Sequence, residues 1–264
     1  MGRCRRSCVA YWTRGLVMAY GQMAMVYDHL MAHAPYEKWV EFTEEMFKEH
    51  EKSIHHIADL GCGTGEITTL LAKKGYQIVG VDYSEEMLTL AESKAMENNV
   101  SVTWLHQDIR SLDGLENLDA AVSYCDVMNY ITEPEDIKAT FHNVYQSLKQ
   151  DGLFLFDVHH LDYILDHYIN QTFAEVTDEA SYIWFCSPGE ELGEMYHDLT
   201  FFYLMNEKYE RFDEQHHQQT YSINFYKEIL EDVGFKNVKV YADFNTKQSN
   251  IDDNTARIFF SAVK

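Results

Sequence analysis

Apolar residues along the chain follow two spacings, one typical of helices and one typical of short buried strands. From about Met23 to Glu51 they fall at helical spacing, and Pro35 divides this segment into two helices. Beyond residue 52, short apolar runs are each followed by a segment with helical spacing. We predict strands at 53–60, 76–82, 100–108, 118–126 and 152–158, and two closing strands at 237–243 and 256–263.

The helical segments between these strands carry start and stop signals. A helix from Ile67 to Lys74 is followed by Gly75, a common helix stop. Ser84 and Ser222 precede two other helical segments, and serine caps a helix by accepting a hydrogen bond from its free backbone N–H groups.

A further helix is predicted to run to Lys149. Thr132 and Glu135 have the spacing of a capping box, and Pro134 lies between them in the first turn.

Strands that alternate with helices predict an α/β fold with a parallel sheet covered on both faces. Residues 161–221 break this alternation, with a helical stretch at 161–170 and antiparallel strands at 181–187, 194–205 and 208–221. We therefore expect one domain made of residues 18–160 and 222–264, with residues 161–221 inserted after strand five as a β-rich lid over a pocket.

The first 17 residues differ from the rest in containing four arginines and no acidic residue. A targeting peptide fits poorly because Arg14 interrupts the apolar stretch and no clean cleavage site follows. Cys4 and Cys8 alone lack the other ligands of a metal site. We interpret residues 1–17 as an upstream or non-native extension, with the native start at Met18.

The charge and composition of the chain limit the kinds of molecule that it is expected to bind. A net charge of −22 opposes binding to phosphate backbones, so we do not expect a nucleic-acid substrate. Five scattered cysteines do not form a disulfide pattern, and no apolar run is long enough to span a membrane. A cytoplasmic protein with free thiols is the expectation, and the sequence does not indicate its oligomeric state.

The segment IADLGCGTGEI, residues 57–67, carries the main chemical signal. A buried strand ends at Leu60, and Gly61, Gly63 and Gly65 form a tight turn into a helix. Asp82 ends the second strand, 17 residues after Gly65, where an acid can bind the ribose hydroxyls of an adenosine.

The glycine spacing separates two classes of cofactor. Dinucleotide-binding loops have a glycine where this chain has Glu66, close to the helix N-terminus that binds a pyrophosphate. A carboxylate there disfavours a phosphate-containing ligand, and a dinucleotide-linked oxidoreductase is a distant alternative.

The ordered motifs DLGCGTG, VDYSEEML, HQDI, LDAAVSYCDVMNYI and LKQDGLFLFDV together resemble those of class I S-adenosylmethionine (SAM)-dependent methyltransferases. The resemblance covers nearly the whole chain from Met18, and the segment MAYGQMAMVYDHLMAHAPYEKW is similar to the YqeM-like branch. It implies a Rossmann-like seven-stranded sheet with helices on both faces and a β lid after strand five. It also implies SAM as the cofactor and S-adenosylhomocysteine as its product.

The resemblance implies roles for the matched positions. The glycine loop would hold the methionine part of the cofactor, with Asp59 near its ammonium group, and Asp82 would hold the ribose. Asp108 would accept a hydrogen bond from the adenine amino group, and residues after strand four would border the methyl group. The implied cofactor-binding residues are Tyr27, Trp39, Asp59, Gly61, Cys62, Gly63, Gly65, Asp82, Tyr83, Met87, Asp108, Ile109, Cys125 and Asp126.

The residues that would act on the acceptor are less well defined. Asp126, His217 and Tyr221 are the catalytic candidates, and strand alternation places His217 and Tyr221 on one face of a lid strand that could look into the pocket. The adjacent histidines 159/160 and 216/217 point to opposite faces of a strand, so each pair supplies at most one ligand and we expect no metal.

The leading hypothesis is a SAM-dependent methyltransferase that acts on a small-molecule acceptor. An RNA base methyltransferase is the first alternative, although it requires a basic face that the net charge opposes. A SAM-binding protein without turnover is the second alternative. The sequence does not reveal which atom is methylated or whether a general base is used.

Overall fold

The computed structural model describes residues 34–50, 53–178, 180–205, 207–247 and 251–264. The first of the two expected N-terminal helices, the extension 1–17 with its two cysteines, and Tyr27 lie outside these residues. The second expected helix is α2 (Tyr36–Glu49), which follows Pro35 as the sequence predicts and buries the side of Trp39, Phe42 and Met46.

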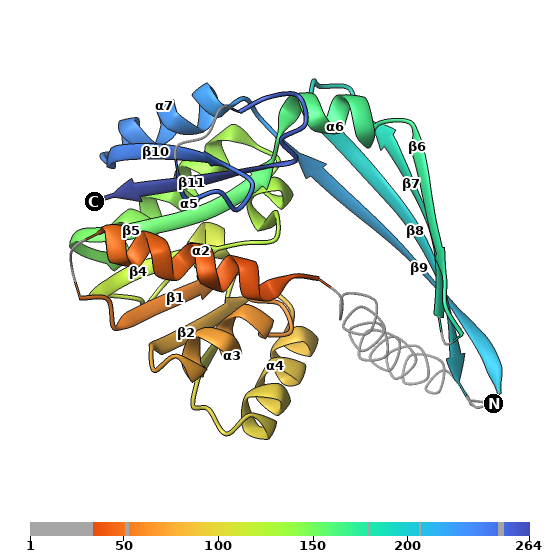
Figure 1. Cartoon of the computed structure of the whole chain (residues 1–264), viewed down its shortest axis with the longest axis horizontal. Coiled ribbons are helices and arrows are strands. Elements are labelled where there is room, and N and C mark those ends of the chain that lie inside the picture. The colour runs from red at the N-terminus through yellow and green to blue at the C-terminus, as the bar shows by residue number, and fades with distance from the viewer. Residues whose placement is uncertain (1–33, 51–52, 179, 206, 248–250) are drawn as a thin grey trace, which may run out of the picture.

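A seven-stranded sheet forms the centre of the molecule, in the order β10-β11-β5-β4-β1-β2-β3 (Figure 1). Strand β11 is antiparallel to both of its neighbours, and the other strands are parallel to one another. The strands are β1 (His56–Leu60), β2 (Gln77–Asp82), β3 (Thr103–His106), β4 (Leu118–Ser123), β5 (Leu148–His159), β10 (Lys236–Ala242) and β11 (Arg257–Val263). The Rossmann-like α/β fold expected from the sequence is confirmed.

Helices cover both faces of this sheet, and each face has its own apolar core. Helices α2 and α3 (Glu66–Lys73) pack on one face, with α4 (Glu85–Glu97) beside α3. Helices α5 (Pro134–Ser147) and α7 (Ile223–Val233) pack on the other. Burial of the central strands on both faces explains why their sequences are nearly continuous apolar runs.

The serine caps are confirmed, but the capping box is not. Ser84 accepts a hydrogen bond from the backbone of Met87, and Ser222 accepts one from Phe225. Helix α5 begins after Glu133, without a side-chain cap, and Pro134 occupies its first turn. The helix also ends at Ser147 rather than at Lys149, because β5 pairs with β4 from Leu148 onward.

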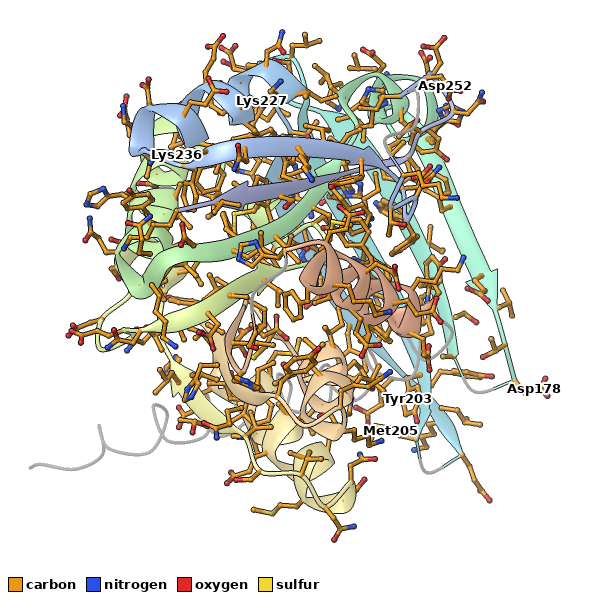
Figure 2. All side chains as sticks on the ribbon, turned by 60° about the vertical axis from the view of Figure 1, so that its left-hand side comes forward. Asp178, Tyr203, Met205, Lys227, Lys236 and Asp252 are labelled. Carbon is orange, nitrogen blue, oxygen red and sulfur yellow. The ribbon has the colours of Figure 1, made fainter. Side chains whose placement is uncertain are left out.

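The segment expected to form a lid, residues 161–221, contains α6 (Leu161–His167) and the antiparallel sheet β6-β7-β8-β9. Its strands are β6 (Gln171–Val176), β7 (Ala180–Pro188), β8 (Glu194–Met205) and β9 (Lys208–Gln219). Strand β6 was not predicted, because its polar residues follow a helical stretch without a clear alternation. The lid stands to one side of the seven-stranded sheet (Figure 1). Asp178, Tyr203 and Met205 lie toward the end of the lid away from Lys227 on α7 (Figure 2).

Candidate functional site

The glycine loop connects β1 to α3, and its three glycines adopt left-handed backbone. The φ angle is +75° at Gly61, +53° at Gly63 and +76° at Gly65, a region that favours glycine. A Cβ at Gly61 would lie 2.4 Å from Val127, and one at Gly65 would lie 2.9 Å from Trp104. Nothing lies within 4 Å of the Cβ position at Gly63. Gly61 and Gly65 therefore permit close packing, while Gly63 borders open space.

Asp82 ends β2 beside this loop. One carboxylate oxygen accepts a hydrogen bond from the N–H of Gly63 at 2.7 Å, and the other accepts one from the N–H of Ser84 at 2.8 Å. Burial raises the pKa of Asp82, and these hydrogen bonds oppose that effect. The backbone of Tyr83 also hydrogen-bonds to this carboxylate. A carboxylate has about four lone-pair sites, so Asp82 can still accept a hydrogen bond from a ribose hydroxyl, and the residues present fit an adenosine ligand.

Asp59 and Cys62 lie on the enclosed side of the loop. Asp59 is 3% exposed and accepts a hydrogen bond from the hydroxyl of Thr68 at 2.5 Å. Burial raises the pKa of Asp59 to about 7, and it raises the pKa of the Cys62 thiol well above its usual range. Asp59 therefore ties β1 to α3 through Thr68, and burial favours the protonated thiol at Cys62.

Asp108 lies two residues beyond the end of β3, at the edge of the sheet where Asp82 ends β2. It caps a 3₁₀ turn, η2 (Ile109–Ser111), and binds the Arg110 guanidinium through contacts of 2.6 and 3.0 Å. This ion pair lowers the pKa of Asp108. Ile109 is buried and Met87 half-buried, whereas the Tyr83 side chain is 75% exposed.

Asp126 follows β4 in an uncommon backbone conformation. Cys125 and Asp126 have φ angles of +57° and +56°, a region that costs a non-glycine residue about 1–3 kcal/mol. The N–H of Asp126 donates to Asp157 at 2.8 Å, and its carboxylate accepts from Arg257 at 3.1 Å and from Gln218 at 2.8 Å. These three contacts hold the strained turn in place.

Asp157 and Arg257 complete a buried ionic cluster that the sequence analysis missed. Asp157 is fully buried and accepts hydrogen bonds from Arg257 at 3.0 Å and from the Trp39 indole at 2.6 Å. The Arg257 guanidinium also lies 5.4 Å from the centre of the Trp39 ring, a cation–π contact. Burial acts to raise the pKa of Asp126, but His159 and Arg257 outweigh it, so this pKa lies well below its usual value. The sequence does contain a signal for this cluster, because Asp157 interrupts the apolar run GLFLFDV and Arg257 interrupts ARIFF.

A chain of hydrogen bonds connects the lid to Asp126. The indole N–H of Trp184 donates to Nδ1 of His197 at 2.9 Å, and Nε2 of His197 lies 3.1 Å from Oε1 of Gln218. The amide of Gln218 then donates to Asp126 at 2.8 Å. Because an indole can only donate, His197 must be neutral with its proton on Nε2. Burial lowers the pKa of His197 to about 4, which agrees with a neutral imidazole ring.

A cavity of ≈ 320 Å³ lies between the lid and the ends of the central strands. We call the lid residues that line it the inner face of the lid. They alternate along β7, β8 and β9, as neighbouring strand residues point to opposite faces. The full lining is Asp126, Tyr130, His159, Tyr168, Glu175, Tyr182, Trp184, His197, Leu199, Phe201, Glu214, His216, Gln218 and Arg257.

The inner face of β9 is not the face that was expected. His216 and Gln218 line the cavity, whereas His217 binds Glu194 at 2.8 Å and stacks on Tyr196 on the outer face. Tyr221 lies beyond the end of β9, and its hydroxyl donates to the backbone oxygen of Thr132 at 2.5 Å. Alternation identifies which residues share a face, but not which face meets the rest of the protein.

The cavity and the glycine loop are joined by η3 (Val127–Tyr130), the turn that follows Asp126. Val127 packs against Gly61, while Tyr130 lines the cavity and its hydroxyl lies 3.1 Å from Nδ1 of His216. The η3 turn therefore contacts both the glycine loop and the cavity.

Among the described residues, no group of three or more His, Cys, Asp or Glu side chains is placed to hold a metal ion. No helix in the described part of the chain is long and apolar enough to cross a membrane. Cys62, Cys125 and Cys186 are free thiols.

Comparison with known proteins gives consistent matches. A family model described as a methyltransferase domain matches residues 57–152. A protein of Geobacillus sp. (strain WCH70) is 39% identical over 250 residues, which cover 94% of this chain and 100% of that protein. The Bacillus subtilis (strain 168) protein named "Putative methyltransferase YqeM" is 39% identical over 248 residues, covering 94% of this chain and 98% of that one.

A solved structure gives a similar result. The SAM-dependent methyltransferase from Clostridium acetobutylicum ATCC 824 matches with a TM-score of 0.83 at 29% identity. The match covers 92% of this chain and 98% of that chain.

Proposed function

The chain belongs to the SAM-dependent methyltransferases, in their YqeM-like branch, and from this premise we propose that it methylates a small molecule bound in the cavity under the lid. SAM is its cofactor and supplies a methyl group already activated by a positively charged sulfur. The observation that carries the proposal is the cavity of ≈ 320 Å³ that lies beside Asp126 and is covered by the lid. This volume is at the lower end of the range for small-ligand sites.

We further propose a division of roles within the chain. Residues 18–160 and 222–264 bind the cofactor, and residues 161–221 form the lid that binds the acceptor. Asp82 holds the ribose, and Gly63 allows the cofactor to approach the loop because no side chain fills the space beside it. The remaining cofactor contacts proposed are those implied by the motifs.

The roles near the acceptor follow from the lining of the cavity. Of the three catalytic candidates only Asp126, in the turn after β4, lines the cavity, and we propose that it positions the acceptor. His217 and Tyr221 lie outside the lining, and we propose no catalytic role for them. Methyl transfer depends strongly on alignment of donor and acceptor, and the lid provides that alignment and excludes water.

The proposal can be tested by incubating the full chain with SAM and two separate acceptor pools. One pool is a small-molecule extract of bacterial cells, and the other is total RNA from the same cells. We expect S-adenosylhomocysteine to form with the first pool only. Formation with RNA alone would contradict the small-molecule proposal. SAM binding without turnover in either pool would contradict enzymatic activity.

A further inference from the structure

The cavity under the lid contains an unbalanced set of charges. Its lining includes three carboxylates, from Asp126, Glu175 and Glu214, and one guanidinium, from Arg257. Arg257 already binds Asp126 and the buried Asp157. A positively charged ligand would therefore meet Glu175 and Glu214 without competition from a second lysine or arginine among the described lining residues.

Aromatic rings surround the same space. Tyr182 and Phe201 are cross-strand partners with ring centres 6.2 Å apart, and Tyr168 and Trp184 make an edge contact at 5.5 Å. Tyr130 adds a fifth ring from η3. The face of an aromatic ring attracts a cation, and tryptophan does so most strongly.

The strand register places the acids beside these rings. Glu175 on β6 is paired with Tyr182 on β7, and Tyr182 is paired with Phe201 on β8. In the neighbouring row, Leu199 is paired with Trp184 on one side and with Glu214 on the other. Adjacent strands are about 5 Å apart, so a compact ligand can contact a ring and a carboxylate together.

From this arrangement we propose that the acceptor is a small amine, which enters the cavity as a cation held by the aromatic rings and by Glu175 and Glu214. The inference rests on the proposed function, because it concerns the acceptor of that same site. It predicts methylation at nitrogen.

The chemistry requires the amine to lose one proton before its lone pair can attack. Glu214 and His216 are suited to take it, since Oε2 of Glu214 lies 3.2 Å from Nε2 of His216. The nitrogen then bonds to the methyl carbon as the carbon–sulfur bond breaks, and the electron pair of that bond stays on sulfur. The methylated product is again an ammonium ion, so its charge balances the loss of the sulfonium.

The first test compares two probes of the same shape, choline and 3,3-dimethyl-1-butanol, which differ in positive charge. Each is titrated by calorimetry into the full chain saturated with S-adenosylhomocysteine. We expect choline to bind at least about tenfold more tightly, since a desolvated cation gains from rings and carboxylates that a neutral isostere does not use. Equal affinity for the two probes would overturn the inference.

Two variants and a matched control sharpen this test. Glu214→Gln and Trp184→Leu should each weaken choline binding by about fivefold or more, given the strength of cation–π and charge contacts. Glu210→Gln removes an exposed carboxylate from the same strand, outside the lining, and should leave choline affinity within about twofold. An equal loss in Glu210→Gln would show a general charge effect and overturn the assignment. Retained affinity for S-adenosylhomocysteine confirms that each variant is folded.

A second test identifies the methylated atom. The full chain is incubated with SAM labelled with ¹³C on the methyl group and with the small-molecule extract, and the product is observed by NMR. An N-methyl signal supports the inference, whereas O-methyl or C-methyl products overturn it while leaving the proposed function intact. Failure of the wild type to bind SAM would instead contradict the proposed function.

Discussion

The glycine loop and the cavity under the lid lie close together, but they depend on contacts of very different range. In the loop, Gly63 binds Asp82, only 19 residues away in the chain. At the cavity, Asp126 binds Gln218 and Arg257, which are 92 and 131 residues away. The proposed cofactor site is thus built from one compact stretch of sequence, whereas the proposed acceptor site brings together elements that are far apart in the chain.

Because of this difference, we expect substitutions in the two regions to have different effects. Substitutions at the loop should alter cofactor affinity with little effect on the lid. Substitutions in the Asp126 cluster should affect stability and the lid together, because the cluster joins β4, β5, β11 and β9.

The largest effect is expected for Arg257→Met. The change leaves Asp126 and Asp157 without their cation in a buried site, and breaking such a pair costs about 3–5 kcal/mol. Urea denaturation should show this loss in the free energy of unfolding. Arg211→Met breaks the exposed pair with Asp213 and should lower the free energy of unfolding far less, because solvent screens that pair. Similar losses for the two variants would contradict a structural role for the cluster.

A smaller effect is expected from the pH dependence of His197. Its pKa in the folded protein is lowered to about 4, below the ordinary histidine value of 6.5. The unfolded chain therefore binds more protons between these values, and stability falls as the pH drops through this window. Linkage gives a loss of about 2 kcal/mol between pH 7 and pH 5.

The measurement for His197 is urea denaturation at both pH values. His197→Gln keeps donor and acceptor groups without a titrating ring, so its loss of stability between pH 7 and pH 5 should be smaller than that of the wild type. His142→Gln, at an exposed position, should retain the wild-type pH dependence. Equal pH dependence in His197→Gln and the wild type would show that His197 is not held neutral.

The next effect concerns the link between the lid and Asp126. Gln218→Leu removes the hydrogen bonds to His197 and Asp126 and should destabilise the protein by about 1–3 kcal/mol, the cost of leaving buried polar groups unsatisfied. Because the glycine loop is unchanged, SAM affinity measured by calorimetry should stay within about twofold of the wild type. A large loss of SAM affinity would mean that the two ends are not separable.

The sequence predicted the features that depend on local contacts better than those that depend on long-range contacts. The glycine loop, Asp82 and the serine caps were predicted because each depends on residues within about one strand–helix unit. The family resemblance implied the seven-stranded sheet with helices on both faces. The inner face of β9 could not be predicted, since alternation alone leaves both faces possible until β9 packs on η3.

There is a physical reason why some features of the structure were not predicted. Asp157 and Arg257 are single charged residues within apolar strands, and the sequence alone does not show that the fold brings them together. Strand β6 lacks an apolar alternation because five of its six residues are exposed. Its place in the sheet depends on pairing with β7 rather than on its own sequence.

The most direct test of the account is calorimetric binding of SAM to the wild type, Asp82→Ala and Asp119→Ala. Asp119 is the matched control, because its carboxylate also accepts hydrogen bonds from two backbone N–H groups, those of His55 and His56 at the start of β1. We predict that Asp82→Ala weakens SAM binding by about tenfold or more, or about 1.4 kcal/mol, while Asp119→Ala retains wild-type affinity. Unchanged affinity in Asp82→Ala, or no binding by the folded wild type, would contradict the proposed cofactor site.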